Sequence, residues 1–399
     1  MRRRFGFWWL LIPVMLLIGL WVKPAGVGDL FVESERPPAT AAASAMLFGP
    51  GIETPTLLPA QLLQTAVPTD TPVPPPATAV PTETPVPALT TLLFTGVIVP
   101  ARCVQAAIDV RGDAEYVYDE VRHLIQAADL AVGTLNTTLS DASNHTGCVE
   151  TFVLTSDSRS AVAMANAGFD VMSVATNHIM NCAGDSCGLG YTLAFRDTLD
   201  NLRANNILPV GAGLVHAEAM QPVVVEVNGV RFGFVSLGMV NEAVFAGENW
   251  PGIAVLNEAN LQQAIAAARA EADVVIAMPH WGPEDDALPN DYQMVFAQVA
   301  VEAGADLVVG NHTHVVQAIE QIDGVDVFYG LGNFIFDQTW DLAHQQGMIL
   351  LVHFEGARYL GYELIPTHVD GDGTVHIAGA AEAGEILERM REASALIQR

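Results

Sequence analysis

The chain has 399 residues, of which 45 are acidic and 17 are basic, so its formal charge is −28. Nucleic acids and anionic membrane surfaces are bound through basic patches, so this charge argues against both as partners. At roughly 150 residues per domain, the length would permit two or three domains, but the low-complexity N-terminal quarter leaves one sizeable folded unit.

The first segment, residues 1–23, is apolar. Three arginines precede the uncharged run from Phe5 to Val22, a layout typical of a signal peptide or a membrane anchor. Positive charges stay in the cytoplasm, which places the rest of the chain on the extracytoplasmic side. No small-residue cleavage site follows closely, so the sequence favours an uncleaved single-pass anchor in the cell membrane, with secretion after cleavage as the alternative.

Residues 24–89 form the second segment, which is rich in Pro, Thr and Ala. Of the 23 prolines in the chain, 13 lie between Pro37 and Pro87. Such a composition buries no core and favours extended, disordered chain. We expect a stalk that separates the folded domain from the membrane.

The chain has four cysteines, which export would place in an oxidising compartment. Three pairings are possible. The short spacing between Cys182 and Cys187 favours a small loop, which leaves Cys103 to pair with Cys148. C-x-x-C spacing, which is typical of a cysteine metal site, is absent from the sequence.

Residues 90–370 alternate short apolar runs with helical periodicity, which predicts an α/β domain, and residues 371–399 are expected to add a C-terminal strand and helix. The expected strands are Leu92–Val99, Leu130–Leu135, Phe169–Val174, Val274–Met278, Asp306–Val309 and Val325–Tyr329. The expected helices are Glu115–Ala128, Ser158–Ala167, Tyr191–Asn205, Asn260–Ala272 and Tyr292–Ala303.

Two antiparallel hairpins are also expected in this domain. The runs Val223–Val227 and Val230–Val235 flank Asn228-Gly229, the dipeptide that favours a type I′ turn. A second hairpin is expected over Met348–Pro366, broken at Gly356.

Polar residues follow three of the predicted strands. Asn177 and His178 come after the run ending at Val174, His280 follows Met278, and His312 and His314 follow Val309. In α/β sheets, ligands gather at the carboxyl ends of strands, so we expect these side chains to converge. Imidazole nitrogens and an amide oxygen are fitting ligands for Zn, Fe or Mn, so the pattern predicts a divalent metal site.

Four motifs make the resemblance to a known family specific. They are Ala175-Thr176-Asn177-His178, His280-Trp281-Gly282, Gly310-Asn311-His312-Thr313-His314-Val315-Val316-Gln317 and Phe328-Tyr329-Gly330-Leu331-Gly332-Asn333-Phe334. In this order and spacing they resemble the motifs of the CapA family of poly-γ-glutamate capsule biosynthesis proteins. The resemblance covers roughly Leu92 to Pro366, and it implies a layered α/β/β/α sandwich similar to that of calcineurin-like metallophosphoesterases.

The resemblance also implies roles for individual residues. Asn177, His280 and His312 would hold one divalent ion, His314 would face a second, and His178 would act on the leaving group or on the transition-state charge. The implied function is the biosynthesis, export or anchoring of an anionic polymer such as poly-γ-glutamate, with that polymer or other capsule machinery as partners. A secreted metal-dependent phosphoesterase or hydrolase and a non-catalytic binding module on the same fold are the alternatives.

Two positions depart from the family pattern. The family has Gly-Asp at the end of its first strand, where this chain has Gly96-Val97, and Asn-Leu-Glu at the end of its second, where this chain has Thr134-Leu135-Asn136. Two carboxylates that would hold divalent ions are therefore absent. A site for a single ion, or for none, remains open.

Two further groups of polar residues are assigned lesser roles. Glu284, Asp285 and Asp286 are expected to form a solvated acidic loop, with the mouth of the cleft as the alternative. Asp337 and Gln338 are expected to orient the histidines from behind.

Overall fold

The computed structural model describes residues 88–187, 191–240 and 244–398. The expected anchor, residues 1–23, and nearly all of the expected stalk lie outside these ranges. Within them, no helix is both long and apolar enough to cross a membrane.

The larger sheet has eight strands, and β1 (Leu89–Ile98) lies near its centre. The strand order is β18-β17-β16-β1-β2-β5-β6, and β15 also pairs with β1. Neighbouring pairs among β1, β2, β5 and β6 are parallel, as is β1 with β15, whereas β16, β17 and β18 are antiparallel to their neighbours. The other strands of this sheet span Leu130–Leu135 (β2), Val171–Ser173 (β5), Leu208–Val210 (β6), Asn333–Ile335 (β15), Gln346–Glu355 (β16), Arg358–Val369 (β17) and Val375–Ile377 (β18).

The smaller sheet has six strands in the order β13-β14-β12-β11-β9-β8. Its four inner strands are parallel, and the two edge strands, β8 and β13, are antiparallel to their neighbours. The strands span Val223–Val227 (β8), Val230–Gly238 (β9), Val274–His280 (β11), Leu307–Val309 (β12), Ile319–Ile322 (β13) and Val325–Phe328 (β14).

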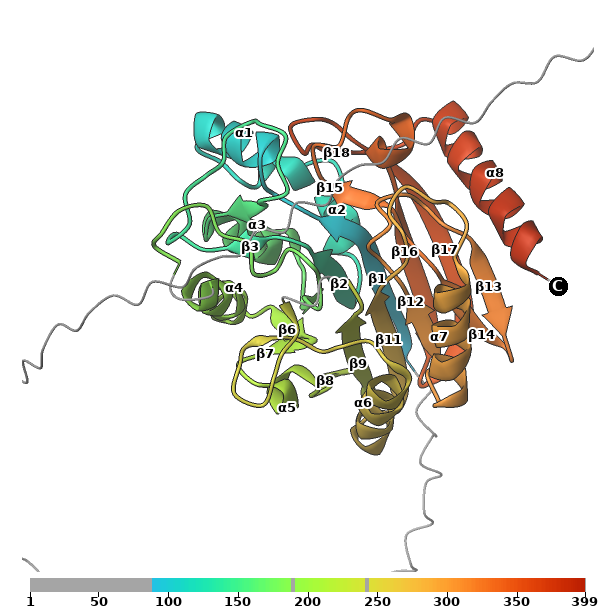
Figure 1. Ribbon diagram of the computed structural model, residues 1–399. Coiled ribbons are helices and arrows are strands. Elements are labelled where there is room, and N and C mark those ends of the chain that lie inside the picture. The colour runs from blue at the N-terminus through green and yellow to red at the C-terminus, as the bar shows by residue number, and fades with distance from the viewer. Residues whose placement is uncertain (1–87, 188–190, 241–243, 399) are drawn as a thin grey trace, which may run out of the picture. The chain divides into compact units, whose positions relative to one another are not determined.

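The two sheets pack face to face between two layers of helices, as Figure 1 shows. Leu92 and Phe94 of β1 share one apolar core with Phe232 and Phe234 of β9. A second core joins the outer face of the larger sheet to α1 (Cys103–Arg111), α2 (Arg122–Ile125), α3 (Arg159–Ala167) and α4 (Thr192–Ala204). A third joins the outer face of the smaller sheet to α6 (Glu258–Glu271) and α7 (Asp291–Glu302). The molecule is thus a mixed α/β protein of four layers.

The remaining elements are short or lie at the edges. The C-terminal helix α8 (Ala380–Ile397) packs on β13 and β17, one strand from each sheet. Two small ladders pair β3 (Thr138–Leu139) with β4 (Thr155–Ser156), and β7 (Ala212–Gly213) with β10 (Gly252–Ile253). The helix α5 (His216–Ala219) and the 3₁₀ turns Tyr116–Tyr118 and Leu342–Gln345 complete the described elements.

The local patterns of the sequence predict most of these elements. The prediction of β2 is confirmed residue for residue, and the first hairpin turns at Asn228 and Gly229, whose φ angles of 52° and 78° are those of a type I′ turn. The second hairpin is also confirmed, as β16 and β17.

The expected helix Glu115–Ala128 is wrong. This stretch forms the 3₁₀ turn Tyr116–Tyr118 and the one-turn helix α2. Tyr116, Val117 and Tyr118 are buried in succession, which a regular helix with one apolar face cannot achieve. The chain therefore bends at this point. The sequence analysis also missed α1, although Val104 and Ile108 lie four residues apart on its buried face.

Candidate functional site

The predicted site residues lie at the carboxyl ends of strands from both sheets. Asn177 and His178 follow β5 in the larger sheet, His280 is the last residue of β11, and His312 and His314 follow β12. Because β11 and β12 are parallel neighbours, their ends meet at one edge.

The turn after β12 has an unusual backbone. His312 and His314 both have positive φ angles, 108° and 61°, which is uncommon for residues other than glycine. Gly310 lets this turn lie against the buried Trp281, because a Cβ atom at 310 would be 2.3 Å from the indole Nε1. The close packing sets the direction from which the two histidines enter the site.

Three of the predicted residues converge. The Nε2 atom of His280 lies 2.9 Å from Asn177 Oδ1 and 3.1 Å from His312 Nδ1. All three side chains are buried, with exposed fractions of 1% for His280, 2% for His312 and 6% for Asn177. We call Asn177, His280 and His312 the inner triad.

His314 lies beside the inner triad and is held separately. Its ring centroid is 6.1 Å from that of His312, and its Nδ1 is 2.8 Å from Asn333 Oδ1. The Asn333 amide donates to Gln338 Oε1 and to the His344 carbonyl, so its Oδ1 is the acceptor for His314. His314 Nδ1 therefore carries the proton, which leaves the lone pair on Nε2.

The orientation of His280 has less support. Its Nδ1 atom is buried and has no hydrogen-bond partner among the described residues. Its ring is therefore positioned by packing and by the two contacts of Nε2, whereas a metal-binding histidine usually also donates its other nitrogen to a neighbouring acceptor.

His178 faces the site from the other side. Its Nδ1 lies 2.8 Å from Asn181 Oδ1, and its backbone N–H donates to Asn136 Oδ1 at 3.0 Å. Asn136, where the family pattern has an acid, thus binds the backbone of the segment that carries His178. Val97, the other departure, is fully buried in an apolar cluster that includes Leu154 and Phe336.

Burial keeps these imidazoles neutral. It lowers the pKa of His280 well below its ordinary value, and the neighbouring histidines lower it further. Burial likewise lowers the pKa of His312 to about 3 and that of His314 to about 4, and it lowers the pKa of His178. Neutral imidazole is the form that binds metal ions.

The inner triad offers donor atoms suited to a divalent transition metal. The His280 Nε2 atom has the amide oxygen of Asn177 at 2.9 Å on one side and the imidazole Nδ1 of His312 at 3.1 Å on the other. Ligands about 2.1 Å from one ion and at right angles to each other are about 3 Å apart, so this spacing fits a single ion. The donor set carries no negative charge, which distinguishes it from a two-metal site.

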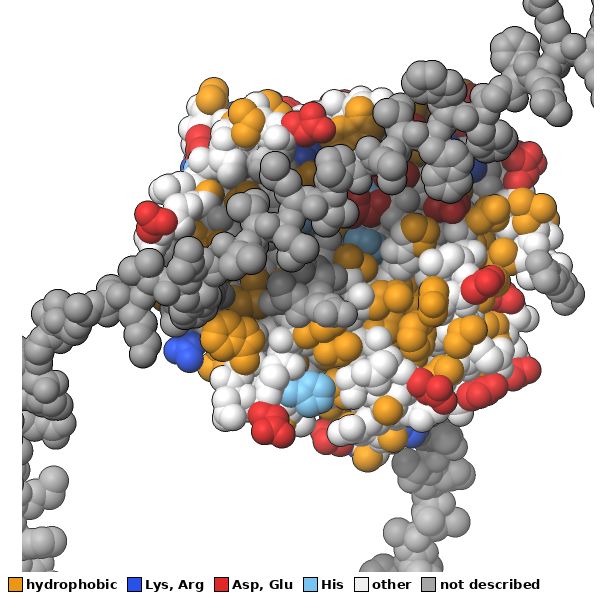
Figure 2. All heavy atoms as spheres, viewed as in Figure 1, with side chains coloured by type: hydrophobic (Ala, Val, Ile, Leu, Met, Phe, Trp, Pro, Cys, Tyr) orange, Lys and Arg blue, Asp and Glu red, His pale blue; other side chains and the backbone are white. Residues whose placement is uncertain are grey.

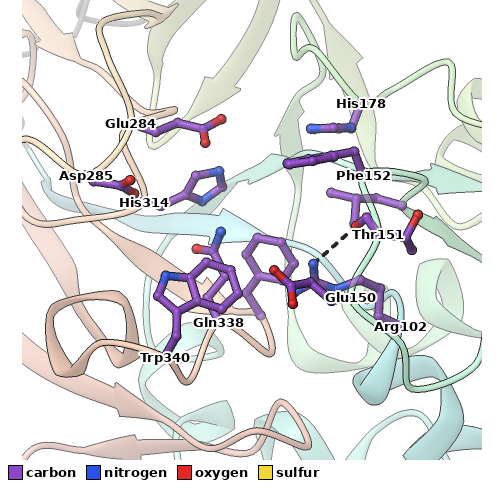
Figure 3. Close-up of a pocket in the computed structure, with 12 residues that line it drawn as sticks. Arg102, Glu150, Thr151, Phe152, His178, Glu284, Asp285, His314, Gln338 and Trp340 are labelled. Atoms are coloured by element: carbon purple, nitrogen blue, oxygen red, sulfur yellow. Dashed lines mark hydrogen bonds between the residues drawn. The ribbon is translucent and has the colours of Figure 1, made fainter.

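A cavity of about 450 Å³ opens beside the histidines. Figure 3 shows His178 and His314 on opposite sides of this cavity, with the Glu284 carboxylate directed between them. Glu284, Asp285 and Asp286 are exposed, as expected of a solvated acidic loop, and Glu284 and Asp285 also line the cavity, which is the alternative. Burial raises the pKa of the Glu284 carboxyl, and the charge of Asp285 adds to this effect.

The opposite wall of the cavity depends on a buried ion pair. Arg102, which is 5% exposed, binds Asp337 through Nε at 2.9 Å and through Nη2, and its Nη1 donates to the Thr151 carbonyl at 3.2 Å. Its guanidinium lies 4.8 Å from the centroid of the Phe336 ring, and its φ angle is 53°. No motif in the sequence points to Arg102. The expected role of Asp337 is wrong, because Asp337 binds Arg102 and not a histidine, whereas Gln338 does support His314 through Asn333.

The four cysteines pair as the sequence favours, Cys103 with Cys148 and Cys182 with Cys187. The first pair connects the start of α1 to the segment that carries Glu150, Thr151 and Phe152 on the cavity wall. Two links therefore hold this segment of the cavity wall in place: the Cys103–Cys148 disulfide and the hydrogen bond from Arg102 to the Thr151 carbonyl.

A second group of metal-binding residue types lies elsewhere. Asp109, His145 and Asp157 bring one ligand atom each within 4.8 Å of one another, the one such group of three His, Cys, Asp or Glu side chains in the described ranges. The Arg159 guanidinium binds both carboxylates, so a cation is already present there.

Comparison with known proteins identifies the family. The profile of the family described as bacterial capsule synthesis protein PGA_cap matches residues 91–338, well over half of the chain. The chain belongs to the PGA_cap family. The matched range contains every histidine of the site, the two departures at Val97 and Asn136, and the Arg102–Asp337 pair.

Curated relatives of this PGA_cap member include two CapA proteins. The PGA biosynthesis protein CapA of Bacillus subtilis is 30% identical over 250 residues, which cover 62% of this chain and 63% of that protein. The capsule biosynthesis protein CapA of Bacillus anthracis is 29% identical over 248 residues, which cover 60% of this chain and 58% of that protein. The chain thus matches less than two thirds of the length of either relative.

Solved structures with a similar arrangement share little sequence with this PGA_cap chain. A hypothetical protein from Thermus thermophilus has a TM-score of 0.42 at 15% identity and covers 69% of this chain and 98% of its own. A phosphatase from Mycoplasma pneumoniae has a TM-score of 0.43 at 12% identity and covers 70% of this chain and 94% of its own.

Proposed function

We propose that this PGA_cap member acts in the biosynthesis, export or anchoring of an anionic capsule polymer such as poly-γ-glutamate, outside the membrane to which its N-terminal segment attaches it. The observation that carries the proposal is that the family match, residues 91–338, includes the whole histidine cluster and every residue that lines the cavity beside it except Trp340. Two relatives bear capsule or PGA biosynthesis names, which supports poly-γ-glutamate as the polymer.

The proposal includes a metallophosphoesterase-like fold and one divalent ion, Mn, Fe or Zn, at the inner triad. Two facing sheets whose strand ends carry Asn177, His280 and His312 support it. Such an ion would act as a Lewis acid and supply hydroxide near neutral pH. Across the cavity, neutral His178 would contact the leaving group of a bound substrate.

The charge of the cavity also supports a bound cation. Glu150, Glu284 and Asp285 line the cavity, and the Arg102 charge is already balanced by Asp337. Figure 2 shows acidic side chains spread over the visible face with few basic ones. An anionic polymer would be repelled by such a surface, and a divalent ion at the histidines would offset the repulsion.

The experiment replaces CapA of Bacillus subtilis with this chain and measures poly-γ-glutamate on the cell surface. We expect the unaltered chain to restore the polymer and the H280A/H312A double variant to lose at least 90% of it, because the inner triad is then left with one ligand. The matched control is H123A, which removes an exposed histidine on α2. An undiminished amount of polymer with H280A/H312A would show that these histidines are not needed for the function.

A metal-dependent hydrolase is the second candidate, favoured by the position of His178 across the cavity from His314. Purified chain supplied with Mn²⁺ or Zn²⁺ and a phosphoester would then show hydrolysis that H178A slows. Polymer restored without measurable hydrolysis would instead favour a binding role.

A further inference from the structure

The end of the larger sheet brings no negative charge to the histidines. Val97 is fully buried among apolar side chains, and the Asn136 amide is neutral, with its Oδ1 bound to the His178 N–H. A divalent ion held only by neutral ligands keeps its full charge in a buried place, which costs free energy. The nearest carboxylate in the described structure therefore matters.

That carboxylate is Glu284. Its Oε1 lies 3.9 Å from His312 Nε2, and within the described ranges no other acid comes within 4.0 Å of a ring nitrogen of His178, His280, His312 or His314. The side chain is 41% exposed, so it can close the remaining distance by rotating about its own bonds.

The loop that carries Glu284 is fixed to the turn that carries the histidines. The Asp285 N–H donates to the Thr313 carbonyl at 3.0 Å, and Thr313 lies between His312 and His314. At the start of the loop, Gly282 has a φ of 85°, and a Cβ atom there would lie 2.4 Å from the Gln293 side chain. The glycine lets the chain turn back, which brings the partly exposed Glu284 carboxylate to the side of His312.

The two nitrogens of His312 therefore face different groups. Nε2 faces the Glu284 carboxylate, and Nδ1 faces His280 Nε2 at 3.1 Å. A proton on Nε2 would be shared with the carboxylate, which directs the Nδ1 lone pair toward the inner triad. Asn333 imposes the opposite arrangement on His314, whose proton is on Nδ1.

We propose that Glu284 is the positioning carboxylate of His312: it holds the proton on Nε2, turns the Nδ1 lone pair toward the inner triad, and supplies the nearby negative charge that positions 97 and 136 lack. A carboxylate behind a metal-binding histidine makes it a stronger ligand, and losing such a partner typically weakens metal binding about 10- to 100-fold. This inference rests on the metal-binding part of the proposed function.

The first measurement is Zn²⁺ and Mn²⁺ affinity by isothermal titration calorimetry with the full-length chain. We expect E284A to bind about 10- to 100-fold more weakly than the unaltered chain, and E284Q to lie between the two because its amide oxygen still accepts a hydrogen bond. The matched control is D286N, which removes one negative charge from the same exposed loop and should change the affinity less than twofold.

The second measurement requires no metal. The ¹⁵N chemical shifts of the His312 ring report which nitrogen carries the proton, and we expect Nε2–H in the unaltered chain and a mixture of tautomers in E284A. Equal affinity in E284A, an equal loss in D286N, or Nδ1–H in the unaltered chain would each overturn the proposal. A chain that binds no metal at all would refute the metal part of the proposed function as well, whereas the first three outcomes leave that part intact.

Discussion

The two sheets meet at one edge but contribute different chemistry to it. The smaller sheet supplies His280, His312 and His314. The larger sheet supplies one histidine, two amides and an apolar residue: His178 and Asn177 after β5, Asn136 after β2, and Val97 near the end of β1. The smaller sheet thus supplies the imidazole ligands, and the larger sheet supplies one amide ligand, Asn177, together with amides that position histidines.

This difference shows how a site can lose charge without losing its shape. The Asn136 amide binds the backbone of His178, and Asn333 of β15 binds His314. Both contacts keep an imidazole in place and neither adds a negative charge. The comparison of the two sheets can therefore be tested with variants that disturb position or charge separately.

The largest effect is expected from the ion pair on the side of the larger sheet. R102M leaves the Asp337 carboxylate buried, 3% exposed, without its guanidinium, which should lower the free energy of unfolding by about 3 to 5 kcal/mol. Urea denaturation measures the change. The matched control is R391M, because Arg391 and Glu388 form an ion pair on the surface and removing it should cost less than about 1 kcal/mol. Equal losses in the two variants would contradict a structural role for the buried pair.

An intermediate effect is expected from pH, on the side of the histidines. Burial lowers the pKa of His314 to about 4, whereas an unfolded histidine titrates near 6.5. Between these values the unfolded chain binds a proton that the folded chain does not, so stability falls as pH falls from about 6.5 to 4. Each unit by which the folded pKa lies below the unfolded one corresponds to about 1.4 kcal/mol of unfolding free energy.

The H314Q variant isolates this contribution. Its unfolding free energy, measured in urea at several pH values between 7 and 4, should fall less steeply with pH than that of the unaltered chain. The difference in slope should correspond to at most one proton taken up on unfolding. Parallel curves for the two proteins would show that His314 has the same pKa in the folded and the unfolded chain.

The smallest effect is expected from the support of His314. N333A removes the acceptor for the Nδ1 proton of His314. If His314 is a ligand of the ion, this loss should weaken metal binding about 10- to 100-fold. N201A is the matched control, because Asn201 also donates its amide to a backbone carbonyl, that of Leu139, on α4. Calorimetric metal titration of both variants should show a loss in N333A alone. Unchanged affinity in N333A would confine metal binding to the inner triad.

The sequence predicts those parts of the fold that follow from local patterns. The short apolar run of β2 and the Asn228-Gly229 turn are specified by neighbouring residues, and the structure confirms both. The expected helix at Glu115–Ala128 is wrong because its apolar residues are buried in succession against the core, which depends on distant elements. Strand-end motifs likewise locate the site, since the carboxyl ends of parallel strands share an edge.

The remaining site contacts depend on residues far apart in the chain. Arg102 and Asp337 are separated by 235 residues, and no local pattern links them. Asn333 lay inside a motif noted in the sequence, but its contact with His314 depends on where β15 joins the larger sheet. Glu284 lies four residues after His280, and only the turn at Gly282 decides that it faces the cavity.

The backbone of Arg102 has a consequence for how this wall can vary. A φ of 53° suits glycine, so glycine at 102 would relieve local strain of about 1 to 3 kcal/mol. It would also leave the buried Asp337 carboxylate without its ion-pair partner. Replacing Arg102 or Asp337 alone therefore lowers the stability of the fold. Homologues that differ at 102 should therefore differ at 337 too.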